Sequence, residues 1–254
     1  MLTALLLALV GGADLLRTHL GRRGAVAGVI ALWAVALSAA LVGLGAPLLG
    51  VIVVAALGGM WLLLTTTAEG RRPPGGLRPA AGLVVAVLLL SVADRSGGAL
   101  SGFLVDAYPA LGRSGPLPPL DQALMALGAA VFLLESGNVI VRAALYRELA
   151  QPEGPPQRRL SLRARFSRPP TEEVRLPDLR GGRAIGPLER MLVAGLTLAG
   201  AVGLAGAVFA AKGIVRFPEI SRDGASGAKA EYFLVGSLVS WAIALACAAL
   251  VAVA

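Results

Sequence analysis

The sequence contains a single cysteine, Cys247, and a single histidine, His19, among its 254 residues. One cysteine excludes a disulfide scaffold, and one residue of each kind cannot provide the spacing of a zinc, haem or iron–sulfur site. There is no Gly-rich loop ending in Lys-Ser/Thr and no G-x-S-x-G turn, because residues 98–102 have the wrong register. The paired-Asp pattern of membrane alcohol phosphotransferases is also missing. We therefore expect no metal, no cofactor and no familiar hydrolase or kinase chemistry, although an enzyme of unfamiliar design stays open.

Charged residues are also scarce: they make up 15% of the chain, whereas 56% of the residues are hydrophobic. The mean hydropathy is +0.77. About a quarter of the residues of a typical soluble domain are charged. A soluble chain of this length could not bury so much apolar surface in one core, and a disordered chain would not carry it. The sequence therefore predicts an integral membrane protein.

Seven apolar segments approach the length of about 20 helical residues that a bilayer core requires. They are residues 1–17, 24–45, 47–67, 79–94, 119–141, 188–211 and 231–253. The first segment differs from a signal peptide because it lacks a basic region before Leu5 and a convincing cleavage site. Residues 96–118 are interpreted as a loop, with or without an interfacial helix. The predicted fold is an all-α polytopic transmembrane helix bundle.

Arginine predominates among the basic residues and indicates an orientation. Seventeen of the 23 basic residues lie between the first and second, third and fourth, and fifth and sixth segments. The positive-inside rule makes this side cytoplasmic, with the N-terminus outside and the C-terminus in the cytoplasm of a bacterial inner membrane. Lys212, Arg216, Arg222 and Lys229 conflict with this orientation, which places them outside. The net charge of +8 favours anionic lipid headgroups over a nucleic-acid partner, because most of it lies between apolar segments.

The one sizeable polar segment divides the chain into three parts. Residues 1–147 form a five-span region, residues 148–187 a Pro/Arg-rich cytoplasmic linker, and residues 188–254 a two-span region. The linker contains seven prolines, which forbid a long helix. Eleven arginines face six acids between positions 142 and 190. Such a linker either lies on the anionic leaflet or docks a cytosolic or membrane protein partner.

Polar side chains inside the fifth segment are the first candidate site. Glu135, Asn138 and Arg142 lie at helical spacing and share one face. An ionisable group inside a membrane span costs several kcal/mol and is a functional candidate for that reason. Glu135 could carry a proton or hold a cation, or it could be bonded to a neighbouring helix and stabilise the bundle.

A second polar patch lies near the cytoplasmic end of the first segment. It comprises Asp14 with Arg17 and Thr18, and His19 follows directly. A side chain near a helix end can reach water, which favours a structural interpretation over a functional one.

Three motifs close to the C-terminus resemble a bacterial multi-pass membrane family of unknown function. They are I-G-x-L-E-R at 185–190, A-A-K-x-I-x-R-F at 210–217, and A-E-Y-x-L-x-G-x-x-x-S at 230–240. The resemblance covers residues 183–242, and Asp14 matches an acidic residue of the family's first span. It implies membership of that family and transfers no activity.

These motifs indicate a second site. Lys212 and Arg216 share one helix face, and we expect them to face Glu231 and Tyr232 at the start of the last span. Such a cluster is either an ion-pair clamp between two helices or a site for an anion or lipid headgroup. Ser237 and Ser240 would extend it inward.

The sixth segment carries two further features. We expect Glu189 and Arg190 to anchor it at the membrane interface. Small residues at every fourth position predict a ridge for close helix packing, formed by Gly195, Ala199, Gly203, Ala207 and Ala211.

Three functional hypotheses follow from the sequence. The first is a non-enzymatic accessory or scaffold protein that docks a partner through its linker. The second is a small ion- or proton-coupled transporter that uses Asp14, Glu135 and the basic pair Lys212 and Arg216. The third, a lipid-acting enzyme at Lys212 and Arg216, is the weakest because no nucleophile or metal set accompanies the cations.

Overall fold

The computed structural model describes residues 1–68, 75–98, 100–112, 117–149, 182–221 and 228–254, and these residues form helices with no strand among them. The helices are α1 (Leu2–His19), α2 (Arg22–Ser38) with a π-turn at Ala39–Gly43, α3 (Leu48–Leu64), α4 (Arg78–Ser96), α5 (Phe103–Ala107) with a 3₁₀ turn at Tyr108–Leu111, α6 (Leu120–Leu149), α7 (Gly182–Leu198), α8 (Val202–Ser221) and α9 (Ala228–Ala252).

Five of the described helices are long and apolar enough to cross a membrane: α1, α2 with its π-turn, α4, α6 and α9. Helix α3 is equally apolar but has 17 residues, the lower limit for a span. Many large apolar side chains of α2, α3 and α4 face outward, as helices in contact with lipid do. The predicted all-α fold is confirmed, and the five long apolar helices are compatible with the predicted membrane protein.

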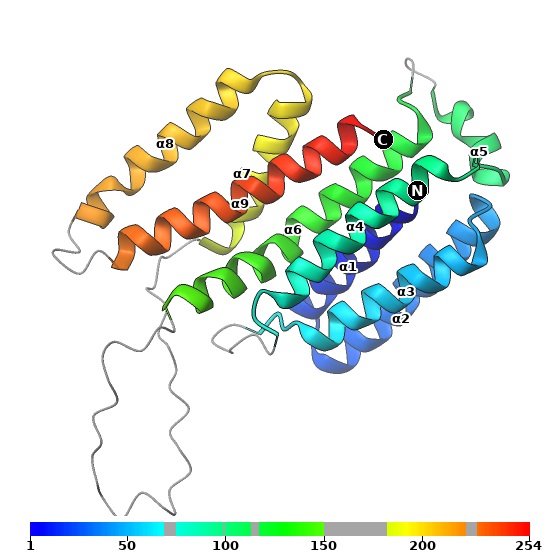
Figure 1. Cartoon of the computed structure of the whole chain (residues 1–254), viewed down its shortest axis with the longest axis horizontal. Coiled ribbons are helices and arrows are strands. Elements are labelled where there is room, and N and C mark those ends of the chain that lie inside the picture. The colour runs from blue at the N-terminus through cyan, green and yellow to red at the C-terminus, as the bar shows by residue number, and fades with distance from the viewer. Residues whose placement is uncertain (69–74, 99, 113–116, 150–181, 222–227) are drawn as a thin grey trace, which may run out of the picture.

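Helix α1 lies at the centre of the bundle and packs closely along α6 (Figure 1). Two glycines permit this approach. A Cβ atom on Gly11 would lie 2.6 Å from the backbone of Phe132, and one on Gly128 would lie 2.4 Å from the carbonyl oxygen of Ala4. The two helices therefore run parallel with their backbones almost in contact, a packing typical of small residues in membrane bundles.

Hydrogen bonds identify which helix ends lie together. The Asp94 carboxylate at the end of α4 accepts bonds from the backbone N–H groups of Leu2 (2.8 Å) and Thr3 (3.0 Å). At the same end of the bundle, Gln122 Nε2 at the start of α6 donates to the carbonyl oxygen of Val251 near the end of α9 (3.3 Å). The first and last residues therefore lie at one end of the molecule (Figure 1). The prediction that they lie on opposite sides is wrong.

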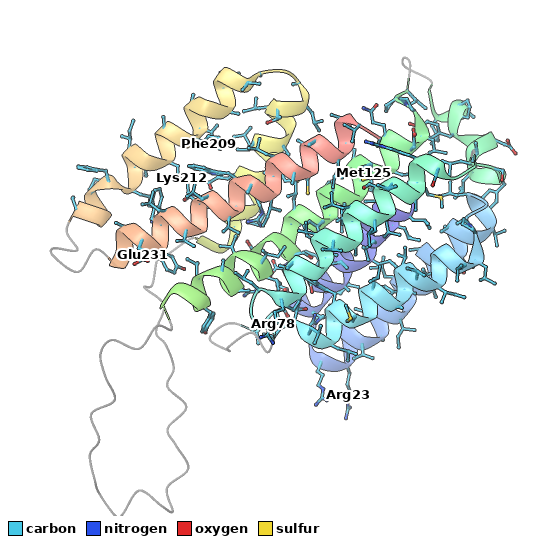
Figure 2. All side chains as sticks on the ribbon, in the orientation of Figure 1. Arg23, Arg78, Met125, Phe209, Lys212 and Glu231 are labelled. Atoms are coloured by element: carbon cyan, nitrogen blue, oxygen red, sulfur yellow. The ribbon has the colours of Figure 1, made fainter. Side chains whose placement is uncertain are left out.

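The opposite end carries basic residues. Arg23 and Arg78 lie there, whereas Met125 lies toward the end that holds both termini (Figure 2). Exposed arginine side chains at the starts of two helices, Arg22 and Arg23 of α2 and Arg78 of α4, define what we call the basic end.

The C-terminus lies at the opposite end from the predicted one because of the structure of the sixth predicted span, residues 188–211. Helix α7 ends at Leu198, and α8 begins four residues later at Val202. Gly200 adopts a φ of +73°, which L-residues with side chains rarely adopt, and turns the chain back on itself. The single span is therefore a helical hairpin, and the predicted small-residue ridge is divided between its two helices. Both predictions are wrong.

Two segments between the predicted spans are partly helical. Helix α7 begins at Gly182, so residues 182–187 of the predicted linker are helical, and Pro187 lies inside the helix. The rest of the linker up to residue 181 lies outside the described residues, apart from the end of α6. Between α4 and α6, the predicted loop forms α5 and the 3₁₀ turn. It contacts the end of α2, where the backbone N–H of Ser101 donates to the carbonyl oxygen of Leu44 (3.3 Å).

Candidate functional site

Asp14 of α1 is fully buried in the centre of the bundle. Its Oδ2 atom accepts hydrogen bonds from Trp61 Nε1 of α3 (2.9 Å) and Ser136 Oγ of α6 (2.7 Å). Its Oδ1 atom accepts a bond from Arg17 one turn further along α1 (3.2 Å). The carboxylate thus joins three helices through donors of the same chain. The expectation that Asp14 reaches water at a helix end is wrong.

Arg17 connects this carboxylate to the end of α3. Its second terminal nitrogen donates to the carbonyl oxygen of Thr65 (2.7 Å), the residue that follows the last turn of α3. Carbonyl groups at helix C-termini lack intrahelical partners and carry partial negative charge. The arginine therefore satisfies both the carboxylate and a helix end.

Glu135 of α6 is 4% exposed and forms the second centre of buried charge. Its Oε1 accepts a bond from Thr18 Oγ1 of α1 (3.0 Å), and its Oε2 accepts a bond from Asn138 Nδ2 (3.2 Å). Arg142 lies 3.8 Å from Oε1. The prediction that Glu135, Asn138 and Arg142 share one face of a helix is confirmed. The bond from Thr18 joins the two polar patches that the sequence suggested separately.

Arg190 of α7 is 1% exposed, so the prediction that it anchors a helix at the membrane interface is wrong. Its Nε donates to the carbonyl oxygen of Leu133 (2.9 Å), and Nη2 donates to Asn138 Oδ1 (2.8 Å). Nη1 reaches Ser240 Oγ of α9 (3.4 Å). The guanidinium fits because residue 137 is glycine, where a Cβ atom would lie 2.6 Å from Nε.

Together these groups form what we call the buried polar network, which bonds α1, α3, α6, α7 and α9 to one another. Its members are Asp14, Arg17, Thr18, Trp61, Thr65, Glu135, Ser136, Asn138, Arg142, Arg190 and Ser240. All four carboxylate oxygens of Asp14 and Glu135 accept hydrogen bonds from the chain. This arrangement suits the stabilisation of helix packing better than the binding and release of an ion.

The second predicted site is arranged differently from the expectation. Lys212 of α8 pairs with Glu189 of α7 (2.5 Å) rather than with Glu231. The Lys212 ammonium also lies 6.0 Å and 5.8 Å from the ring centroids of Phe233 and Trp241 of α9. This ion pair closes the α7–α8 hairpin. Glu189 is therefore a partner across the hairpin, and its predicted role as an interface anchor stays a prediction.

The remaining predicted residues lie around this hairpin. Glu231 is exposed at the start of α9, while Lys212 lies on the neighbouring α8 (Figure 2). Arg216 lies one turn beyond Lys212, and Tyr232 is half-buried in the first turns of α9. Ser237 and Ser240 are buried, but Ser240 belongs to the buried polar network through Arg190.

Several network residues escape sequence reasoning. Trp61, Thr65 and Ser136 are ordinary side chains within apolar segments, and only their contacts reveal their role. Asp94, outside this network, could have been singled out from the sequence, because an acidic residue at the end of an apolar run needs a partner. It finds one in the first turn of α1.

Comparison with family models, curated proteins and solved structures finds no match to this chain. The resemblance to a bacterial membrane family therefore stays a prediction. Among the described residues, no group of three or more His, Cys, Asp or Glu side chains could hold a metal ion.

We predict that Asp14→Asn destabilises the bundle by about 3 kcal/mol, because it leaves the Arg17 guanidinium without its charge partner in an apolar setting. Asp14→Asn combined with Arg17→Met should recover part of that loss, since the double variant removes both charges. Denaturant unfolding of the purified protein in detergent micelles measures both effects. Asp106→Asn, an exposed carboxylate of α5, is the matched control and should change little. Additive effects of the two substitutions would contradict the pairing.

Proposed function

We propose that this chain is a multi-pass membrane protein whose basic end faces the cytoplasm. In this arrangement α1, α2, α3, α4, α6 and α9 span the bilayer, and α7 and α8 form a hairpin that enters from the cytoplasmic side. The position of the exposed Arg22, Arg23 and Arg78 at one end of the bundle supports this orientation, although the exposed Arg95 lies at the other end. The hairpin supports it further, because it carries Lys212 and Arg216 back toward the basic end, which is the cytoplasmic side in this proposal.

We further propose that the protein is a non-enzymatic accessory or scaffold component. The observation that carries this proposal is the saturation of the two buried carboxylates, Asp14 and Glu135, in which each oxygen accepts a hydrogen bond from the protein itself. An ion pathway needs carboxylate oxygens that exchange partners, so the geometry gives the transporter hypothesis little support. The hypothesis of a lipid-acting enzyme has less support than the transporter hypothesis, because Lys212, its proposed anion-binding residue, is paired with Glu189.

The docking element in this proposal is the Pro/Arg-rich segment 148–187. It joins α6 to α7, and the end of α6 and the start of α7 both lie toward the basic end (Figure 1). Its proline content disfavours helix, and its arginine content suits an acidic partner surface. By the family resemblance, the proposed location is a bacterial inner membrane.

The proposed orientation predicts which positions an impermeant thiol reagent reaches in intact cells. Three single-cysteine variants in a Cys247→Ala background suit the test, because each site is exposed: Gly21→Cys, Gly98→Cys and Val253→Cys. A charged maleimide should label Gly98→Cys and Val253→Cys at once, and Gly21→Cys only after permeabilisation. Labelling of Gly21→Cys in intact cells would invert the orientation. Labelling of only one of positions 98 and 253 in intact cells would contradict the placement of the end of α4, beside the first residues, and the end of α9 at the same end of the bundle.

Docking through the linker predicts the effect of deleting residues 150–180 and joining the ends with a short Gly/Ser segment. The bundle should keep its unfolding midpoint, because every bond of the buried polar network lies outside the deletion. A protein that co-purifies with the intact chain from its own host membrane at fixed stoichiometry should be lost. Native mass spectrometry shows whether the partner accompanies the intact chain and the deleted chain, and denaturant unfolding measures the midpoint.

The control for this deletion is a chain in which residues 150–180 are scrambled at constant composition. Charge and proline content alone would be enough to place the segment on an anionic leaflet. Docking of a specific partner requires the order of the residues, so the scrambled chain should also lose the partner. Retention of the partner by the scrambled or the deleted chain would contradict docking through this segment.

A further inference from the structure

Two buried donors near the basic end of α6 have no hydrogen-bond partner among the described residues. They are Nη2 of Arg142 and the hydroxyl group of Tyr146. The two residues are four positions apart and therefore share one face of α6. Tyr146 is 8% exposed, so bulk water does not satisfy its hydroxyl group. A buried donor without a partner is costly and rare in native proteins.

The other contacts of Arg142 hold its guanidinium in place. Nη1 donates to the carbonyl oxygen of Thr67, just beyond the end of α3 (3.2 Å). Nη2 lies 3.8 Å from Glu135 Oε1, beyond hydrogen-bond distance. The arginine is thus oriented by the segment that follows α3 and by Glu135 of α6, and its Nη2 group stays available one helical turn from Tyr146.

The charges of the buried polar network do not balance. Arg17, Arg142 and Arg190 contribute three positive charges, and Asp14 and Glu135 contribute two negative ones. Arg190 reaches no carboxylate directly but contacts Asn138, which in turn bonds Glu135. One positive charge in this apolar setting therefore lacks a counterpart within the network, and a bound anion would supply it.

We propose that Arg142 and Tyr146 form a binding site for a phosphate oxygen at the basic end of the bundle. A guanidinium N–H and a phenolic hydroxyl are suitable donors to a phosphate oxygen, and a singly charged phosphodiester matches the one unbalanced charge. Tyr146 lies near the basic end of α6, a helix long and apolar enough to cross a membrane, and lipid headgroups lie at the ends of such helices. The phosphate belongs either to an anionic lipid such as phosphatidylglycerol or to free inorganic phosphate. This site does not depend on the proposed docking function.

The test measures binding to the delipidated full-length protein by native mass spectrometry, with phosphatidylglycerol and inorganic phosphate as separate probes. Tyr146→Phe removes the hydroxyl group and keeps the ring, so the fold is preserved. It should weaken binding of the preferred probe about tenfold or more, the effect of one lost hydrogen bond to a charged group. Arg142→Gln should abolish binding. Phosphatidylcholine, which carries a phosphate without net negative charge, should bind more weakly than phosphatidylglycerol.

Tyr108→Phe is the matched control, because the Tyr108 hydroxyl donates to the carbonyl oxygen of Pro118 at the other end of the molecule. It should leave binding unchanged. Retention of phosphatidylglycerol identifies a headgroup site, and retention of inorganic phosphate alone identifies a free-anion site with the same donors. Failure of the wild-type protein to bind either probe would overturn the proposal. Equal binding by the wild-type and Tyr146→Phe proteins would overturn it too, since binding would then take place elsewhere.

Discussion

The buried charge of Asp14 and Glu135 determines how the helices around α1 and α6 are arranged. A carboxylate inside an apolar bundle is unfavourable unless donors surround it. Asp14 obtains its donors from α3, α6 and its own helix, and Glu135 obtains a donor from α1 and another from α6. Any movement of one of these helices would leave a charge without its partners. The polar groups thus specify a single packing among helices whose apolar surfaces would tolerate several.

Close backbone contact and the buried polar network depend on each other. Gly11 and Gly128 bring α1 and α6 near enough for the short side chains of Thr18 and Ser136 to reach the two carboxylates. Gly137 has the same role for Arg190, whose guanidinium contacts the backbone of α6 directly. Larger side chains at these glycines would separate the helices and break the bonds. Small residues therefore position the charged groups as well as the helices.

The apolar helices could be predicted because each follows from a local property of the chain. Long, predominantly apolar runs give α1, α2, α4, α6 and α9, and the helical period places Glu135, Asn138 and Arg142 on one face. The break between α7 and α8 could not be predicted in this way. The apolar run continues through it, and the turn depends on the positive φ of a single glycine in a glycine-rich sequence.

The partners of the charged residues were the least predictable part. An arginine near the start of an apolar run usually lies at the membrane interface, and nothing local indicates that Arg190 is buried against Gly137. Lys212 pairs with Glu189 only because the chain reverses at Gly200. Long-range pairs of this kind depend on which helices are neighbours, and that is decided by the packing of the whole bundle.

The central claim is that Glu135 stabilises the bundle rather than carrying ions, and hydrogen exchange of the Glu135→Gln variant in lipid nanodiscs tests it most directly. The claim predicts that backbone amides of α7 around Arg190 and of α6 around Asn138 exchange about tenfold faster than in the wild-type protein, because the bonds that join these helices are weakened. Amides near Met125 should be unaffected, and Glu231→Gln, at an exposed site, should change nothing. Unchanged protection throughout α6 and α7 would contradict the claim and favour an ion pathway through Glu135.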